Sequence, residues 1–325
     1  MKKFLLSSVF AATFAFLAAC GDDSSSGPEM ESSSSVEAEE DSSSSEETSS
    51  SSIVANTSSS LRDVASSSSA VIASSSSANG SSSSIADEVC YGEYGAEYTC
   101  VTTKYLNQDM LDTNGYGEFV DTRDKKVYKT VIIGEGTKAQ TWMAQNLNYD
   151  YNEGIAESHC YSDDDANCDK YGRLYTWSAA MDSAGVFSND CKGCGYGTVY
   201  SAGGTIQGVC PEGWHLPNKA EWDTLFTNVG GEDVAGRMLK SEEGWNDYSE
   251  STEGIDSYGF SALPAGYRDY YGDFYKAGLY ANFWSSSEYD SKYAYSMYLG
   301  YDGEDANLDN SIKYFAFSVR CVQNN

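Results

Sequence analysis

Nine cysteines are the side chains of this 325-residue sequence with the clearest capacity for chemistry. Thiols can pair as disulfides, bind zinc or take part in redox exchange, and their spacing helps to decide between these roles. Cys20 stands apart in an apolar N-terminal stretch. The other cysteines number eight. An even count is typical of a disulfide framework in an exported chain, and eight cysteines allow 105 connectivities. These eight are Cys90, Cys100, Cys160, Cys168, Cys191, Cys194, Cys210 and Cys321.

The CxxC motif formed by Cys191 and Cys194 has three interpretations, because such motifs also occur in redox enzymes and zinc sites. It lies in a glycine-rich loop, CKGCGYG, rather than at the start of a patterned helix, and there is no second CxxC. The two histidines, His159 and His215, are far apart and have no evident third ligand. A structural disulfide is therefore favoured over redox activity and over metal binding.

Acidic side chains in a cysteine-bounded loop give a candidate calcium site. Calcium binds six to eight oxygen ligands in a flexible geometry, and carboxylates are its usual protein ligands. This loop, like the acidic stretch 302–309, has no full EF-hand spacing, so a solvated acidic turn is the alternative. No other cofactor is expected. The candidate ligands are Asp163, Asp165, Asn167 and Asp169.

Tyrosines crowd the stretch 267–280, which we take as a candidate ligand-binding site. Sugars stack on flat, half-exposed aromatic rings, and loops on a rigid scaffold commonly carry binding residues. A polysaccharide or another cell-surface partner is therefore the expected ligand, and the alternative is that the rings only pack together. The residues are Tyr267, Tyr270, Tyr271, Tyr275 and Tyr280.

Charge and missing motifs exclude several other functions. The formal net charge is −29, and residues 90–325 hold 36 acidic against 17 basic side chains. Such a surface disfavours nucleic acid and anionic membranes. The sequence has no phosphate-binding glycine loop, no Gly-x-Ser-x-Gly elbow and no His-Glu-x-x-His. Binding is therefore expected rather than catalysis.

The N-terminus predicts export and lipid attachment. Residues 1–19 have the basic start and short apolar run of a signal peptide. Leu-Ala-Ala-Cys at 17–20 resembles the lipobox of bacterial lipoproteins, which implies acylation of Cys20; an ordinary signal peptide is the alternative. Gly21, in place of an aspartate, favours delivery to the outer membrane. We expect an envelope protein exposed at the cell surface and held to the membrane by its lipid.

The lipidated cysteine and the residues after it, 20–89, form a candidate tether. Thirty of the 69 residues in 21–89 are serine, 13 are acidic, and none is aromatic. A chain of this composition cannot bury enough apolar surface to offset its ordering entropy, so disorder is predicted. The tether would hold a folded domain away from the membrane.

The elements that would position the candidate groups lie in 119–325, after a cysteine-bounded extension at 90–118. The sequence CPEGWHLPNKAEW at 210–222 predicts a short strand around His215, followed by a helix. Asn218 and Glu221 have the spacing of a capping box. Apolar residues then recur at helical spacing from Trp222 to Val229.

The remaining periodicity predicts an α+β class with two main helices among many short strands. Helices are expected at 168–182 and 232–240. A hairpin is expected at 119–134, with its turn around Asp124 and Lys125. Strands are expected at 140–148, 259–268, 281–289, 293–301 and 312–322. In the last strand Phe315, Phe317, Val319 and Cys321 share one face, and Ala316, Ser318 and Arg320 share the other.

Several of these segments together resemble one known family. They are YKTVIIG and QTWMAQNLNY within 128–149, CDKYGRLYTWSAAM at 168–181, GVCPEGWHLPNKAEW at 208–222, FSALPAGYRD at 260–269, FWSSSEY at 283–289 and FSVRCV at 317–322. In this order they resemble the Fibrobacter succinogenes major paralogous domain over about 119–323. That domain is similar to the C-type lectin-like fold and to formylglycine-generating enzymes. The resemblance implies two helices, a twisted antiparallel sheet and long loops, but no particular activity.

Proximity and the family pattern imply the pairs Cys90–Cys100, Cys160–Cys168, Cys191–Cys194 and Cys210–Cys321. The favoured function is a surface-displayed binding module. One alternative is a structural envelope or adhesion component without a small ligand. Another is an enzyme of the formylglycine-generating type, which would need reactive cysteines where the C-terminal half offers only Cys210 and Cys321.

Overall fold

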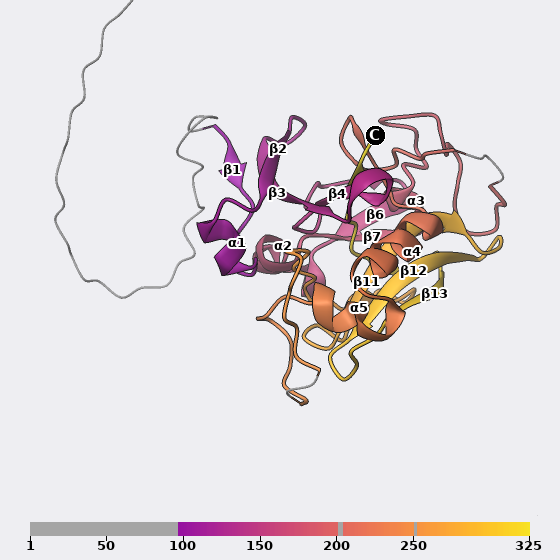
Figure 1. The fold of residues 1–325 in the computed structure, drawn as a ribbon. Helices are drawn as coiled ribbons and strands as arrows, with labels where there is room; N and C mark the ends of the chain where they lie inside the picture. Colours follow the sequence, from indigo (N-terminus) through magenta and orange to yellow (C-terminus); the bar gives the residue numbers. More distant parts are fainter. Residues whose placement is uncertain (1–96, 201–203, 250–251) are drawn as a thin grey trace, which may run out of the picture. The chain divides into compact units, whose positions relative to one another are not determined.

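A computed structural model describes residues 97–200, 204–249 and 252–325 (Figure 1). This part of the chain contains both helices and strands, and the strands form three sheets. The α+β class expected from the sequence is therefore confirmed. The predicted signal peptide, the predicted lipidation site Cys20 and the predicted serine-rich tether all lie outside the described residues.

The first sheet joins a hairpin to strands from distant parts of the chain. β3 pairs antiparallel with β2 and β4 and parallel with β1, while β15 lies between β4 and β8. The predicted hairpin turn is confirmed: Lys125 has a φ of 61°, and its N–H donates to Asp121 O at 2.8 Å. The strands are β1 (Thr99–Cys100), β2 (Gly117–Asp121), β3 (Lys126–Ile133), β4 (Gln140–Met143), β8 (Trp214–His215) and β15 (Val322–Gln323).

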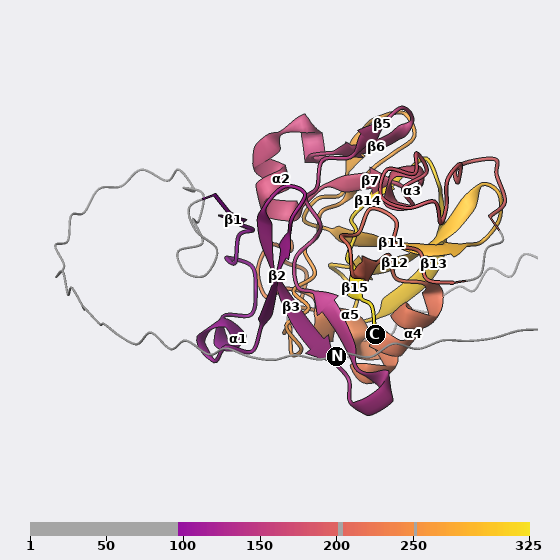
Figure 2. The same ribbon diagram turned by 90° about the horizontal axis from the view of Figure 1, so that it is seen from above.

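The other two sheets are antiparallel throughout. One has the order β10-β9-β14-β7-β6-β5, and the other is the meander β11-β12-β13. Figure 2 shows the β2–β3 hairpin in purple and the strands β12 and β13 in yellow on opposite sides of the folded part of the chain. The strands are β5 (Asn152–Glu153), β6 (Ala156–His159), β7 (Leu174–Thr176), β9 (Tyr267–Arg268), β10 (Phe274–Tyr275), β11 (Tyr280–Glu288), β12 (Tyr293–Gly300), β13 (Ala306–Ile312) and β14 (Ala316–Phe317).

The short strand and the helix start predicted at 210–222 are both confirmed. α4 (Lys219–Asn228) starts at Asn218, and both hydrogen bonds of the capping box are present. Its apolar face packs into one buried cluster with α5 (Glu232–Leu239) and the β11–β13 meander (Figure 1). The face consists of Trp222, Leu225, Phe226 and Val229.

The prediction of a single helix at 168–182 is wrong. The chain instead forms α2 (Asp165–Tyr171), then β7, then α3 (Trp177–Ala180). Gly172 ends α2 with a φ of 71°, and a Cβ there would lie 2.7 Å from that of Asn146. Close backbone approach at this glycine therefore outweighs the helical spacing of its neighbours. The other described helices are the five-residue α1 (Gln108–Asp112) and two 3-10 turns, Gly136–Lys138 and Tyr161–Asp163.

The predicted strand at 312–322 is also interrupted, since β14 and β15 are separate two-residue strands. Its alternation is nevertheless informative. Phe317, Val319 and Cys321 join one buried cluster, and Phe315 packs against it. The opposite face, that of Ala316, Ser318 and Arg320, is buried too. Both faces of this segment therefore belong to the interior.

Three of the four expected disulfides are present. They join Cys160 to Cys168, Cys191 to Cys194 and Cys210 to Cys321. Cys100 is also disulfide-bonded, and its expected partner, Cys90, lies outside the described residues. The Cys210–Cys321 bridge spans 111 residues and ties the segment before β8 to the segment before β15.

Candidate functional site

Arg320 is a fully buried cation between β14 and β15. Its Nε donates to Asn146 Oδ1 at 2.7 Å, and its Nη2 donates to Ser261 O at 3.0 Å. Its Nη1 donates to the backbone oxygens of Met143 and Phe260. Burial lowers the pKa of Arg320 to about 9, so the group still carries its charge at neutral pH. The guanidinium therefore joins the end of β4 to the loop before β9.

Lys240, directly after α5, is enclosed in a similar way. Its ammonium donates to the backbone oxygens of Thr252 at 2.5 Å, Gly300 at 2.9 Å and Gly303 at 2.8 Å. Burial lowers the pKa of Lys240 to about 8, against the opposing effect of Asp302. An ammonium has three N–H donors, so these carbonyl groups replace its water shell completely.

A second buried ammonium, that of Lys313, follows β13 directly. It forms an ion pair with Glu288 and lies 4.4 Å from the ring centroid of Trp177. Three backbone oxygens from two other loops complete its surroundings. They belong to Gly195 and Thr198, each at 3.3 Å, and to Ser291 at 3.2 Å.

Asp256 and Ser261 form a buried polar pair next to Arg320. Asp256 accepts hydrogen bonds from the N–H of Ser261 at 2.8 Å and from its hydroxyl at 2.5 Å. Burial raises the pKa of Asp256 to about 7, although the Ser261 hydrogen bonds and Arg320 act against this. Tyr116 Oη lies 3.3 Å from Ser261 Oγ, and burial raises the pKa of Tyr116 to about 12. A deeply buried serine paired in this way suits structural support better than attack on a substrate.

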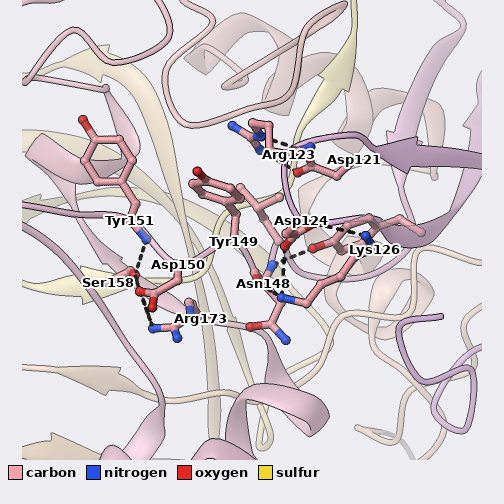
Figure 3. A network of polar contacts seen from close by, with 12 residues as sticks. Asp121, Arg123, Asp124, Lys126, Asn148, Tyr149, Asp150, Tyr151, Ser158 and Arg173 are labelled. Carbon is pink, nitrogen blue, oxygen red and sulfur yellow. Dashed lines mark hydrogen bonds and ion pairs between the residues drawn. The ribbon is translucent and has the colours of Figure 1, made fainter. Parts of the chain in front are cut away.

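A second polar network lies around the β2–β3 hairpin (Figure 3). Arg123 makes a two-pronged contact with the Asp121 carboxylate, at 2.8 and 2.6 Å, and its guanidinium lies 4.1 Å from the ring centroid of Tyr149. Arg173 pairs with Asp150 at 3.1 Å. These charged groups neutralise one another, so the network fixes the hairpin against segment 148–151 rather than offering a free reactive group.

Four of the five candidate tyrosines share one surface with a ring that the sequence did not single out. Phe315 stacks on Tyr267, with centroids 5.7 Å apart at 20°, and on Tyr270, at 6.2 Å and 5°. Tyr270 also contacts Tyr271 at 3.9 Å, and Tyr275 contacts Tyr267 at 5.7 Å. We call these five residues, Tyr267, Tyr270, Tyr271, Tyr275 and Phe315, the aromatic platform.

The outer rings of the aromatic platform are exposed while its base is held firmly. Tyr270, Tyr271 and Tyr275 are 52, 75 and 41% exposed. The Asp269 carboxylate accepts the N–H groups of Tyr271 at 2.8 Å and of Asp273 at 3.0 Å, which fixes the turn between β9 and β10. Exposed flat rings on a fixed turn can stack on a ligand without first rearranging.

Tyr280, the fifth candidate, does not belong to the aromatic platform. It stands at the start of β11 and contacts Tyr298 and Tyr301, with centroids 5.1 and 6.5 Å away. Tyrosines occur throughout 267–280, so no local pattern indicated that Tyr280 lies apart from the other four. Phe315 was missed because it is distant in sequence, and no local pattern links a turn after β13 to the turn after β9.

The two histidines have separate structural surroundings. His215 Nε2 lies 2.7 Å from Glu221 Oε1, and His215 Nδ1 lies 2.7 Å from Asn324 Oδ1. Burial lowers the pKa of His215, but these contacts outweigh it and the net shift is upward. Burial and the neighbouring Arg268 lower the pKa of His159. His215 therefore holds the start of α4 against β15.

The structure does not gather the candidate calcium ligands. Asp163 ends a 3-10 turn, Asp165 begins α2, and the side-chain N–H of Asn167 donates to Tyr161 O at 2.9 Å. Within the described ranges, no group of three or more His, Cys, Asp or Glu side chains is placed to hold a metal ion. Asp163, Asp165 and Asp169 therefore do not form such a group, and Asp163 lies before α2, in the 3-10 turn.

The described helices are also too short or too polar for one of them to span a bilayer.

Comparison with known proteins matches this sequence to one family. Residues 136–323, more than half of the chain, match the Fibrobacter succinogenes major domain. No curated protein and no solved structure matches the chain significantly. The matched region includes the three buried cations, the three described disulfides and the aromatic platform. The chain belongs to the Fibrobacter succinogenes major domain family.

Proposed function

We propose that this protein is a lipid-anchored envelope protein that displays a C-type lectin-like module for binding polysaccharide. The observation that carries the binding role is the aromatic platform, whose three outer rings are exposed on a fixed turn. Rings of this kind offer apolar faces to the C–H groups of a sugar, and their hydroxyl groups can hydrogen-bond its rim.

Charge narrows the ligand to a neutral glycan. Residues 90–325 are strongly acidic, and Asp269 and Asp273 lie in the same turn as the platform tyrosines. A polymer carrying carboxylates or sulfates would be repelled by this field. Cellulose, unsubstituted xylan and chitin are therefore suitable probes.

A sedimentation assay on these three insoluble glycans tests the binding role. We expect wild-type protein to be retained on at least one of them and Tyr270→Ala/Tyr271→Ala to be released into the supernatant. Tyr248→Ala is the matched control, because Tyr248 is a comparably exposed tyrosine that contacts Tyr301 and lies outside the platform. Wild-type protein that stays in solution with all three glycans would contradict the proposal.

The anchoring role rests on Leu-Ala-Ala-Cys at 17–20. Several acyl chains on one cysteine bind a bilayer stably, because each buried methylene contributes about 0.8 kcal/mol. We expect metabolic labelling with a radioactive fatty acid to mark wild-type protein but not Cys20→Ser. Unlabelled wild-type protein in the soluble fraction would contradict lipid anchoring without bearing on glycan binding.

A further inference from the structure

Two exposed rings outside the aromatic platform also stack on each other, and one of them directly precedes the platform residue Phe315 in the sequence. Tyr196 and Tyr314 stack with centroids 4.3 Å apart and an interplanar angle of 18°. They remain 40 and 48% exposed although each covers one face of the other. Two stacked aromatic rings that keep this exposure present flat apolar faces on which a sugar can stack.

Lys313 explains why the two rings meet. It directly precedes Tyr314, and its buried ammonium donates to the oxygen of Gly195, which directly precedes Tyr196. The ion pair with Glu288 keeps this ammonium in place. One buried cation therefore fixes the backbone beside both exposed tyrosines.

Other contacts hold the loop that carries Tyr196. The Cys191–Cys194 disulfide closes the chain just before it. Beyond it, the N–H of Gly197 donates to Ser291 O at 2.7 Å, and the N–H of Tyr200 donates to Glu288 Oε2 at 2.8 Å. The Tyr196–Tyr314 pair is therefore preorganised, which lowers the entropy lost on binding.

The pair is connected to the aromatic platform through the chain itself. Tyr314 is followed directly by Phe315, whose ring is nearly parallel to that of Tyr270. We propose that Tyr196 and Tyr314 form a second subsite for the same glycan, so that the ligand is an extended neutral chain rather than a single sugar or a chain end. This inference rests on the proposed function, since it assumes that the aromatic platform binds sugar.

Calorimetric titration with soluble oligosaccharides of two lengths tests the subsite. The probes are the disaccharide and hexasaccharide of the glycan that retains the wild type. We expect the hexasaccharide to bind more tightly than the disaccharide. Tyr196→Ala/Tyr314→Ala should lower hexasaccharide affinity roughly three- to tenfold and leave disaccharide affinity unchanged. Tyr314→Phe, which keeps the ring, should bind both probes like the wild type.

The single variants Tyr196→Ala and Tyr314→Ala, each checked by thermal melting, supply a readout if the double variant is unstable. Each should show part of the hexasaccharide loss. Equal hexasaccharide affinity in wild type and in the folded alanine variants would overturn the second subsite but leave the platform intact. Loss of disaccharide binding only in Tyr270→Ala/Tyr271→Ala would confirm that the two sites are separate. A wild type that binds no glycan overturns both proposals.

Discussion

The buried cations and the aromatic platform differ in how they use their surroundings. Arg320 and Lys240 are enclosed by backbone oxygens, and little of either side chain meets solvent. Tyr270 and Tyr271 instead contact other rings and leave much of their surface open. Substitutions in the first region should therefore change folding, whereas substitutions in the second should change binding alone.

Removal of the Cys210–Cys321 bridge should have the largest effect on stability. Replacing both cysteines with alanine frees a loop of 111 residues, which on the chain-entropy model lowers the free energy of unfolding by about 5 kcal/mol. Urea denaturation would measure it. Cys191→Ala/Cys194→Ala is the control, because its short loop predicts a loss of about 2 kcal/mol. Equal losses in the two variants would contradict the loop-length argument.

Arg320→Met should lower the free energy of unfolding by about 3 kcal/mol. The substitution keeps an apolar stem but leaves four buried oxygen partners without their donor. Chemical denaturation again gives the measurement. Arg268→Met, in the partly exposed β9, should cost less than about 1 kcal/mol. If the two arginine variants were equally stable, enclosure of Arg320 would not be the determining factor.

Asp256 should make stability depend on pH. Its pKa is raised by burial to about 7 in the folded state, so the folded chain keeps a proton that the unfolded chain loses near pH 4. Its contribution is full below about pH 4 and is lost as the pH rises through about 7. Relative to wild type, Asp256→Asn should thus gain roughly 2 kcal/mol between pH 5 and pH 7. Urea titrations of both proteins at these pH values would show parallel stabilities if Asp256 were ionised throughout.

Tyr270→Ala/Tyr271→Ala should change the free energy of unfolding by less than about 0.5 kcal/mol. Both rings are mostly exposed, so few buried contacts are lost. Thermal melting alongside the sedimentation assay would separate the two properties. A large drop in Tm would mean that the platform supports the fold, and the contrast with the buried cations would fail.

EDTA should leave Tm unchanged. In the described part of the chain, no group of three or more carboxylate, cysteine or histidine side chains is placed to hold an ion. A fall in Tm that added calcium reverses would instead support the calcium site expected from the acidic loop.

Local patterns predicted the elements whose causes are local. The capping box of Asn218 and Glu221 and the turn at Lys125 depend on residues within a few positions, and both are confirmed. The helix expected at 168–182 failed because Gly172 meets Asn146, which is remote in sequence. Helical spacing is a local pattern and does not predict a contact with a residue that is remote in sequence.

The buried cations were missed for a related reason. Alternation placed Arg320 on the face opposite to Phe317 and Cys321, but the interior covers both faces of its segment. Lys240 and Lys313 follow a helix and a strand directly, where a lysine is ordinarily solvated. Among the tyrosines, composition indicated a stretch in which four rings do form one cluster, but it could not separate Tyr280 or add Phe315.

The position of β15 between β4 and β8 has a consequence for the order in which this protein acquires its structure. Val322 pairs with both Trp142 and His215, so the ribosome must add the 179 residues from the end of β4 at Met143 to Val322 before that sheet can close. Contacts so remote along the chain form slowly. A newly made chain would consequently lack the strand that joins β4 to β8 for most of its synthesis.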